Sequence, residues 1–255
     1  IDGVDKKTHV KFSDEVSIVF GSGDGLFREG PRLPVGTEPY SLRAGDFNGD
    51  HFLDLVALNW GSGDISLLLG RVDGTFEAER RFVVGPNPAD MAQADFNDDG
   101  LPDLAVPSFA ADDISILLGN RDGTLNLIFH TTLGPSPNSA DVGDFNRDGR
   151  PDLVVADFSF ISVLYGNGDG TFQSEKRVPV QQRFFSVAVG HFDDNSADDV
   201  ALLGSNFAVF MNGNFDSTPT ADFGKQGSQL LAPGDLNGDG REDLLYSASS
   251  SFGGL

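Results

Sequence analysis

The sequence contains no cysteine, which excludes a disulfide framework and any metal site built on thiolates. It contains no run of about 18 apolar residues, so no segment is expected to insert into a membrane as a helix. Positive charge is scarce, because 17 Lys and Arg stand against 39 Asp and Glu and leave a net charge of −22. Such a chain repels nucleic acid and anionic membranes. The first residue is Ile1 rather than Met, so we expect a mature or excised form.

The acidic residues recur at a fixed interval. The segment GDFNGD at 45–50 returns, with changes, at 94–100, 143–149, 190–196 and 234–240. A second motif, Asp-Gly-Thr followed by Phe or Leu, keeps the same interval at 73–76, 122–125 and 169–172, with a variant at 24–27. Two motifs in constant phase predict five tandem repeats.

Each repeat carries about four short runs rich in Val, Ile, Leu and Phe. In the second unit they are 91–94, 104–107, 114–118 and 127–132. No window shows a sustained period of 3.6 residues, so almost no helix is expected. Four short strands in each unit predict an all-β fold, a β-propeller of four-stranded antiparallel blades with residues 1–255 as one domain of five repeats.

The two ends of the chain bear on the number of blades. The chain starts with 16–20, which corresponds to the third strand of a unit, and ends just after 244–247, which corresponds to a second strand. We expect the two halves to join as one blade and to close a ring of five, because closure removes free sheet edges. The same phase also fits part of a larger ring.

The recurring acidic loops offer a set of oxygen ligands. In the loop 95–103, side-chain oxygens fall at positions 1, 3, 5 and 9, and Gly100 at position 6 allows a turn with positive φ. The carbonyl of position 7 can point inward as well. Hard oxygen donors in a flexible loop suit Ca²⁺, and no His or Cys is placed for zinc. The loop starts like an EF-hand but lacks the Glu at position 12 and the flanking helices.

Four loops keep this ligand set, and we predict a calcium ion in each. The expected ligands, with the residue at position 7 acting through its carbonyl, are Asp46, Asn48, Asp50, Phe52 and Asp54; Asp95, Asn97, Asp99, Leu101 and Asp103; Asp144, Asn146, Asp148, Arg150 and Asp152; and Asp235, Asn237, Asp239, Arg241 and Asp243. In the first loop His51 replaces the glycine, and His tolerates positive φ better than a β-branched residue. The fourth copy keeps only His191, Asp193, Asn195 and Asp199, so we expect it to be empty or weak. The alternative is a set of metal-free Asx-rich turns. Fourfold recurrence, and the repulsion among clustered Asp, favour the cation.

The pattern Asp-Phe-Asn-x-Asp-Gly-x-x-Asp-Leu, followed by Leu-Leu-Gly-Asn-x-Asp-Gly-Thr, resembles the FG-GAP/VCBS repeat family over essentially the whole chain. The resemblance implies calcium-binding blades like those of integrin α-subunit propellers and of some fungal propeller lectins. It is specific for the fold and the ion but not for a ligand, since the family spans adhesins, lectins and accessory domains of secreted enzymes. Members usually have seven blades, so five repeats imply either a smaller ring or part of a seven-bladed one.

We expect the calcium to be structural and the conserved spacing of hydrophobic residues to mark the core. Sites this simple belong to the affinity range of extracellular modules, about 10⁻⁴–10⁻³ M, which predicts an extracellular or cell-surface location. The expected core residues follow each loop's first Asp or each Gly-Thr turn, and they are Phe47, Phe96, Phe145, Phe192 and Leu236, with Phe27, Phe76, Leu125 and Phe172.

Binding is expected on the variable loops between the second and third strands. An aromatic residue next to Asn, Asp or Ser recurs there, and the candidate ligand-binding residues are Asn59, Trp60, Phe109, Asp157 and Phe158. Aromatic faces stack on sugar rings, which favours a glycan or an extracellular protein as partner. The alternative is that Phe109, Phe158 and Phe207 pack between blades.

No catalytic residue is predicted, because the four His are scattered and no hydrolase, metalloprotease or phosphate-loop motif occurs. The sequence therefore predicts a secreted binding module. A structural or adhesion segment of a larger surface protein is the alternative, and a polysaccharide-active enzyme is less favoured.

Overall fold

The computed structural model describes residues 14–180, 183–195, 197–205, 207–216, 219, 229–230 and 233–247. Within these ranges the regular elements are β-strands, apart from one 3-10 turn, η1 (Met211–Gly213). No helix in the described ranges is long and apolar enough to span a bilayer. The prediction of an all-β fold with almost no helix is confirmed.

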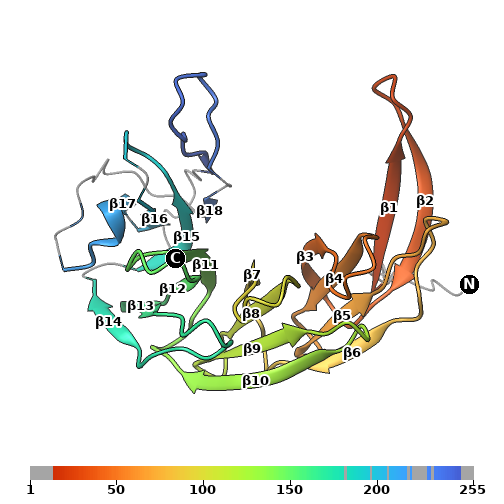
Figure 1. The fold of residues 1–255 in the computed structure, drawn as a ribbon, viewed down its shortest axis with the longest axis horizontal. Coiled ribbons are helices and arrows are strands. Elements are labelled where there is room, and N and C mark those ends of the chain that lie inside the picture. Colours follow the sequence, from red (N-terminus) through yellow and green to blue (C-terminus); the bar gives the residue numbers. More distant parts are fainter. Residues whose placement is uncertain are drawn as a thin grey trace, which may run out of the picture.

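Four antiparallel blades make up the body of the structure (Figure 1). The first blade contains β3 (Pro39–Gly45), β4 (Asp54–Asn59), β5 (Asp64–Leu68) and β6 (Arg80–Val83). The second contains β7 (Ala92–Ala94), β8 (Asp103–Ser108), β9 (Asp113–Gly119) and β10 (Leu125–Thr132). The third contains β11 (Ser139–Gly143), β12 (Asp152–Ala156), β13 (Phe160–Leu164) and β14 (Lys176–Pro179), and the fourth contains β15 (Phe184–Gly190), β16 (Asp199–Gly204) and β17 (Phe207–Phe210). The fold is therefore a propeller of antiparallel blades.

The predicted closure into five blades is wrong for this structure. In the described residues β1 (Glu15–Gly21) pairs with β2 (Phe27–Pro34), and β18 (Gln229–Leu230) pairs with β19 (Tyr246–Ser247), each pair as a separate two-stranded sheet. Figure 1 shows these two sheets on opposite sides of an open arc. The physical reason is the length of the available edge. In complete blades the second strand is five or six residues long, whereas β19 has two, and so few ladder bonds do not offset the loss of chain entropy on closure.

The core lies largely between neighbouring blades. The middle strands β4, β5, β8, β9, β12 and β13 are buried along almost their whole length, as expected for strands covered on both faces. At each boundary the hydrophobic residue of one blade's acidic loop meets the residue after the next blade's turn. The ring centroids of Phe96 and Phe172 are 5.4 Å apart, and those of Phe145 and Phe215 are 5.4 Å apart. These contacts fix how adjacent blades stack.

The predicted core positions are buried where a neighbouring blade covers them. Phe47, Phe96, Phe145, Leu125 and Phe172 are buried, which confirms the prediction, and Phe76 and Phe192 are partly buried. The two exceptions are Phe27, 73% exposed, and Leu236, 66% exposed. Phe27 begins β2 and Leu236 lies in the loop between β18 and β19, at the two ends of the arc, where the described part of the chain supplies no further blade to cover them.

Candidate functional site

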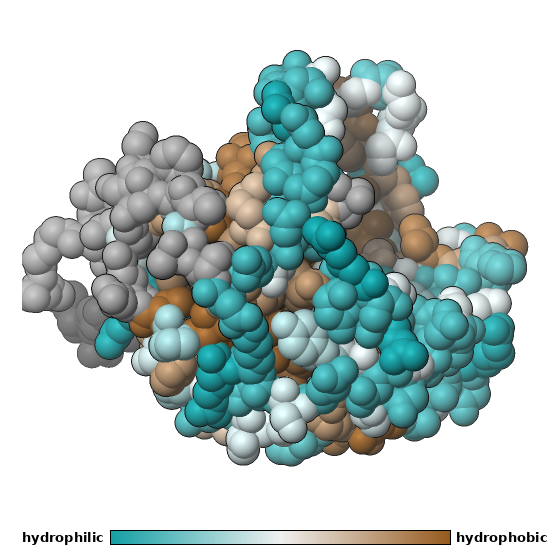
Figure 2. Space-filling model, turned by 60° about the vertical axis from the view of Figure 1, so that its left-hand side comes forward, coloured by the Kyte–Doolittle hydropathy of each residue, from teal (hydrophilic) through white to brown (hydrophobic). Residues whose placement is uncertain are grey.

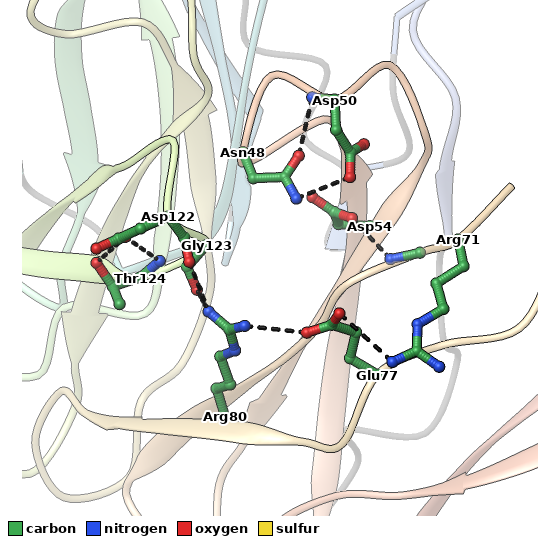
Figure 3. Close-up of polar contacts among 10 residues, drawn as sticks. Asn48, Asp50, Asp54, Arg71, Glu77, Arg80, Asp122, Gly123 and Thr124 are labelled. Atoms are coloured by element: carbon green, nitrogen blue, oxygen red, sulfur yellow. Dashed lines mark hydrogen bonds and ion pairs between the residues drawn. The ribbon is translucent and has the colours of Figure 1, made fainter.

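The acidic loops curl around the side chain at their first position. In the second blade, Asp95 Oδ1 accepts a hydrogen bond from the Asp99 amide at 3.1 Å, and Asp95 Oδ2 accepts one from the Gly100 amide at 2.7 Å. The Asn97 side chain joins the same ring, because its Oδ1 accepts from the Asp99 amide and its Nδ2 donates to Asp99 Oδ2. The bonds to the first aspartate recur in the loops that begin at Asp46, Asp144 and Asp235. Figure 3 shows Asn48, Asp50 and Asp54 of the first loop close together.

The curl needs left-handed backbone at two positions of each loop. At position 6 the φ values are 69° for His51, 82° for Gly100, 81° for Gly149 and 88° for Gly240, so the prediction of a positive φ there, including His51, is confirmed. Position 4 is also left-handed, and its residues are Gly49, Asp98, Arg147 and Gly238. This second left-handed position was not predicted, because Asp98 and Arg147 are not glycines. The glycines at position 4 of the first and last loops, Gly49 and Gly238, were the signal in the sequence that indicated it.

The aspartates at position 9 of the first three loops are fully buried and tie each loop to its own blade. Asp243, at position 9 of the last loop, is only partly buried. Asp103 Oδ2 accepts from the Phe96 amide at 2.8 Å, and Oδ1 accepts from the Gly119 amide, at the end of β9, at 2.9 Å. Asp54 and Asp152 make the equivalent pairs of bonds. This structural role was missed, since the sequence pattern assigned these residues as metal ligands only.

The loops concentrate negative charge. Burial raises the pKa of Asp103 to about 7, and the nearby charges of Asp99 and Asp95 raise it as well. Burial likewise raises the pKa of Asp152 to about 6. Burial opposes ionisation at Asp46 too, but backbone amide bonds outweigh it and lower the pKa of that carboxyl. The carboxylates at positions 1, 5 and 9 are thus near enough to repel one another.

The loops offer oxygen donors of more than one kind. No three Asp, Glu or His side chains of the described residues come together as a complete metal cluster by themselves. A cation in a loop such as 95–103 would therefore also draw on the Asn97 amide oxygen and on the Leu101 carbonyl, as the sequence analysis expected. A set of hard oxygen donors around mutually repelling carboxylates fits Ca²⁺.

The fourth loop has a different local structure. Its first residue, His191, places Nε2 3.1 Å from Asp198 Oδ1, and its amide donates to Glu242. Asp194, at position 4, lacks the left-handed φ of the other loops. Asp199 keeps the position-9 role, since it accepts from the Phe192 and Asn212 amides. Residue 196 lies outside the described residues, and an empty or weak fourth site stays a prediction.

A row of aromatic rings lies at the other ends of the same strands. The calcium-type loops precede β4, β8 and β12, whereas Trp60, Phe109 and Phe158 follow them. Neighbouring ring centroids are 6.0 Å apart for Tyr40 and Trp60, 6.1 Å for Trp60 and Phe109, 5.7 Å for Phe109 and Phe158, and 6.1 Å for Phe158 and Phe185. We call these five residues the aromatic row. It runs across all four blades, from β3 to β15.

The repeat itself positions the row. The amide of Trp60 donates to the carbonyl of Glu38 at 3.0 Å, and the amide of Phe109 donates to the carbonyl of Asn87 at 3.0 Å. Glu38 and Asn87 both have positive φ, in the loops that lead into the first strand of their blades. The amide of Phe158 donates to the carbonyl of a third such loop at 3.4 Å. Equivalent bonds in successive blades therefore set the rings side by side.

The row keeps exposed surface although its members pack on one another. Tyr40 is 69% exposed and Phe185 39% exposed, while Trp60, Phe109 and Phe158 are half-buried. In the space-filling view, hydrophobic residues lie in a recess between hydrophilic protrusions (Figure 2). Phe207, by contrast, is buried in the core of the fourth blade. Packing between blades and surface exposure thus coexist at the predicted aromatic positions.

Two of the predicted ligand-binding residues have no solvent-exposed surface. Asn59 and Asp157 are fully buried. Asn59 Nδ2 donates to Asp64 and Ser66, and the Asp157 carboxylate accepts from the amides of Ser159 and Phe160. These residues close the turns between second and third strands and hold the aromatic residue beside them, rather than facing a partner.

The sequence profile of the FG-GAP-like repeat matches residues 52–106, 95–155 and 144–202, more than half of the chain. The chain belongs to the FG-GAP-like repeat family. No curated protein sequence matches that of this FG-GAP-like chain.

Solved structures similar to this FG-GAP-like propeller share its fold at low identity. An Agrocybe aegerita lectin, described by its recognition of non-reducing terminal N-acetylglucosamine, is 16% identical with a TM-score of 0.60, and the match covers 92% of this chain and 69% of the lectin. BBS1N, solved in complex with ARL6DN, is 16% identical with a TM-score of 0.56, covering 78% and 62%. A functionally unknown protein from Desulfotomaculum acetoxidans is 13% identical with a TM-score of 0.59, covering 87% and 65%. The chain thus spans somewhat less than two thirds of BBS1N and of the Desulfotomaculum protein.

Proposed function

We propose that this FG-GAP-like propeller is a calcium-stabilised extracellular binding module. The observation that carries the proposal is the curl of four loops, which brings the side chains at positions 1, 3 and 5 together, and in three of these loops the carboxylate at position 9 is buried. A cation bound there would relieve the repulsion among the carboxylates and would stabilise the folded state by mass action.

The extracellular part of the proposal rests on affinity. Loops of nine residues with one uncharged side-chain ligand belong with the weaker calcium sites, with a Kd of about 10⁻⁴–10⁻³ M. Only a compartment with millimolar calcium fills such sites.

The binding part of the proposal rests on the separation of the acidic loops from the aromatic row, which lie at opposite ends of the blades. The loops occupy one end of β4, β8 and β12, and the aromatic row occupies the other, so a bound cation would support the fold without covering the row. A glycan or a protein surface is the proposed partner. The lectin neighbour supports the first option and the BBS1N–ARL6DN complex the second, both by fold alone. A structural or adhesion segment of a larger surface protein is the second candidate, and it needs no partner at the row.

Thermal unfolding in calcium, in magnesium and in EDTA tests the calcium proposal. We expect a large fall in the melting temperature on chelation, with recovery in calcium but much less in magnesium, which prefers a stricter octahedral site. Asp95→Asn, at the first position of an intact loop, should weaken the calcium response. Asp193→Asn, in the fourth loop, is the matched control and should leave it unchanged. A melting temperature indifferent to chelator would contradict the proposal.

A further inference from the structure

We infer that the aromatic row docks an extended, arginine- or lysine-bearing segment of a partner protein. The inference rests on the proposed binding function and names the class of partner for it. The row crosses four blades as an unbroken series of rings, with neighbouring centroids no more than 6.1 Å apart. An elongated surface of this kind suits a chain laid along it better than a single small ligand.

The tilt of the rings disfavours a sugar polymer as the occupant. Successive rings meet at 48°, 45°, 86° and 87°, so they form no flat platform on which sugar rings would stack in series. Asn59 and Asp157, the polar residues predicted to contact a ligand beside the rings, are fully buried and bonded internally.

The protein itself shows which cation the row accepts. The guanidinium carbon of Arg183 lies 5.1 Å from the ring centroid of Phe158. This is the distance of a cation–π contact, which a guanidinium makes readily because it is planar and weakly hydrated. The face of one ring is therefore already used by an arginine of the chain, and the other half-exposed rings offer the same chemistry to an arginine or lysine from outside.

The charge of the protein favours a basic partner over a neutral one. The chain carries a net charge of −22, or about −14 with four calcium ions bound (−22 + 8), and would attract a cationic segment over a distance of the order of the Debye length. Two exposed acids lie in loops that build the row or adjoin it. Glu38 holds the Trp60 amide through its carbonyl. Asp112 follows Phe109 closely in the turn before β9, and its Oδ1 accepts from the Ser136 amide at 2.7 Å. A lysine or arginine seated on a ring would have a carboxylate nearby.

Trp60 is the only tryptophan, so its fluorescence reports on the row directly. The experiment titrates the protein, in saturating calcium, with an oligoarginine peptide, an oligoglutamate peptide of the same length and a neutral chitin oligosaccharide. We expect oligoarginine alone to change the Trp60 emission, and its affinity to fall as salt is raised.

Two variants separate docking on the row from unspecific attraction to an acidic protein. Phe109→Ala removes a central ring and keeps Trp60 as the probe, and it should weaken oligoarginine binding by about three- to tenfold. Val72→Ala, which changes an exposed apolar residue in the turn after β5, at the end of the blade away from the row, should leave the affinity unchanged. Glu38→Gln removes an exposed carboxylate beside the row and keeps the size of the side chain, and it should weaken binding most at low salt.

Three other outcomes of the titration would overturn the inference. Oligoarginine that binds without changing Trp60 emission, or with the same affinity for Phe109→Ala, would be attracted by charge alone. A Trp60 response to the chitin oligosaccharide and not to oligoarginine would assign the row to glycans, which refutes the basic partner and leaves the binding module standing. If neither ligand bound, while calcium still raised the melting temperature, the row would have no such role although the calcium proposal held.

Discussion

At the scale of single residues, left-handed backbone is what the calcium-type loops demand most strictly. Position 6 is glycine in three of the four curled loops and His51 in the first, where φ is 69°. A side chain in this conformation strains the backbone, by about 1 kcal/mol or somewhat more. At position 6 the first loop is therefore built less favourably than its copies, whereas at position 4 it has Gly49 and the second and third loops have Asp98 and Arg147.

The substitution His51→Gly should raise the free energy of unfolding by about 0.5–1 kcal/mol, because relief of strain exceeds the extra entropy of glycine in the unfolded chain. The reciprocal change Gly149→His should lower it by a similar amount. Urea denaturation of both variants in EDTA measures the effect without a contribution from calcium. A His51→Gly protein no more stable than the parent would refute the assignment of strain to this position.

Single residues also mark where sequence reasoning stops. Trp60, Phe109 and Phe158 keep exposed surface, whereas their neighbours Asn59 and Asp157, which were predicted for the same surface, are buried. Adjacent residues of an extended chain face opposite sides. Spacing in the sequence shows that residues are close, whereas the pleat decides which of them meets solvent, and at the end of a strand the sequence does not fix that choice.

At the scale of the strand and its loop, the aspartate at position 9 acts as a cross-link within the blade. Asp103 joins the start of its loop to the last residue of β9 through two buried amide bonds. The same two bonds recur in the first and third blades. Loss of the carboxylate would leave two buried N–H groups without acceptors, and each such group costs about 1–3 kcal/mol.

Asp103→Ala should therefore lower the free energy of unfolding by about 2–4 kcal/mol even in EDTA, when no calcium is bound. Asp99→Ala is the matched control. It removes an exposed carboxylate from the same loop, so in EDTA it should lower the free energy of unfolding much less. Chemical denaturation of the two variants with and without calcium makes the comparison. Equal losses in EDTA would mean that the position-9 aspartate has no structural role apart from the ion.

At the scale of the whole molecule, a chain of polar contacts links the first strands of all four blades. Arg43 of β3 lies 3.5 Å from Asp90, which precedes β7 and accepts from Ser139 and Ala140 of β11. Asp141 of β11 then accepts from the Val189 amide of β15 at 2.7 Å. Burial raises the pKa of Asp90 and of Asp141, and in Asp141 the charge of Asp90 adds to the rise.

A carboxyl whose folded-state pKa is raised stabilises the protein most when it is protonated. Its contribution is complete below the unfolded pKa of about 4 and is lost as the pH rises through the folded pKa. Asp90→Asn should therefore flatten the fall in melting temperature between acid and neutral pH at constant calcium. Asp73→Asn is the control of opposite sign, because hydrogen bonds from Thr75 lower the pKa of this exposed carboxyl. A steeper fall for Asp90→Asn would contradict the assignment.

The repeat was readable from the sequence, and the number of blades was not. Two motifs in phase gave the strands of the second blade almost to the residue, since local hydrophobic runs and turn residues determine them. Closure depends instead on pairing between segments at the two ends of the chain. The pattern at 244–247 looked like a second strand of ordinary length, but β19 has two residues and pairs only with β18 in the described residues.

The open arc has a consequence for how the molecule unfolds. At each blade boundary a hydrophobic residue of one blade packs on a residue of the next, as Phe96 packs on Phe172. At the two ends of the arc, Phe27 and Leu236 lack such a partner blade in the part of the chain that the structure describes, and they are exposed. Coupling between nearest neighbours then holds the four blades from both sides and the end sheets from one. Cooperativity should decline from the middle outward, so that the end sheets open first and a single melting temperature describes mainly the four blades.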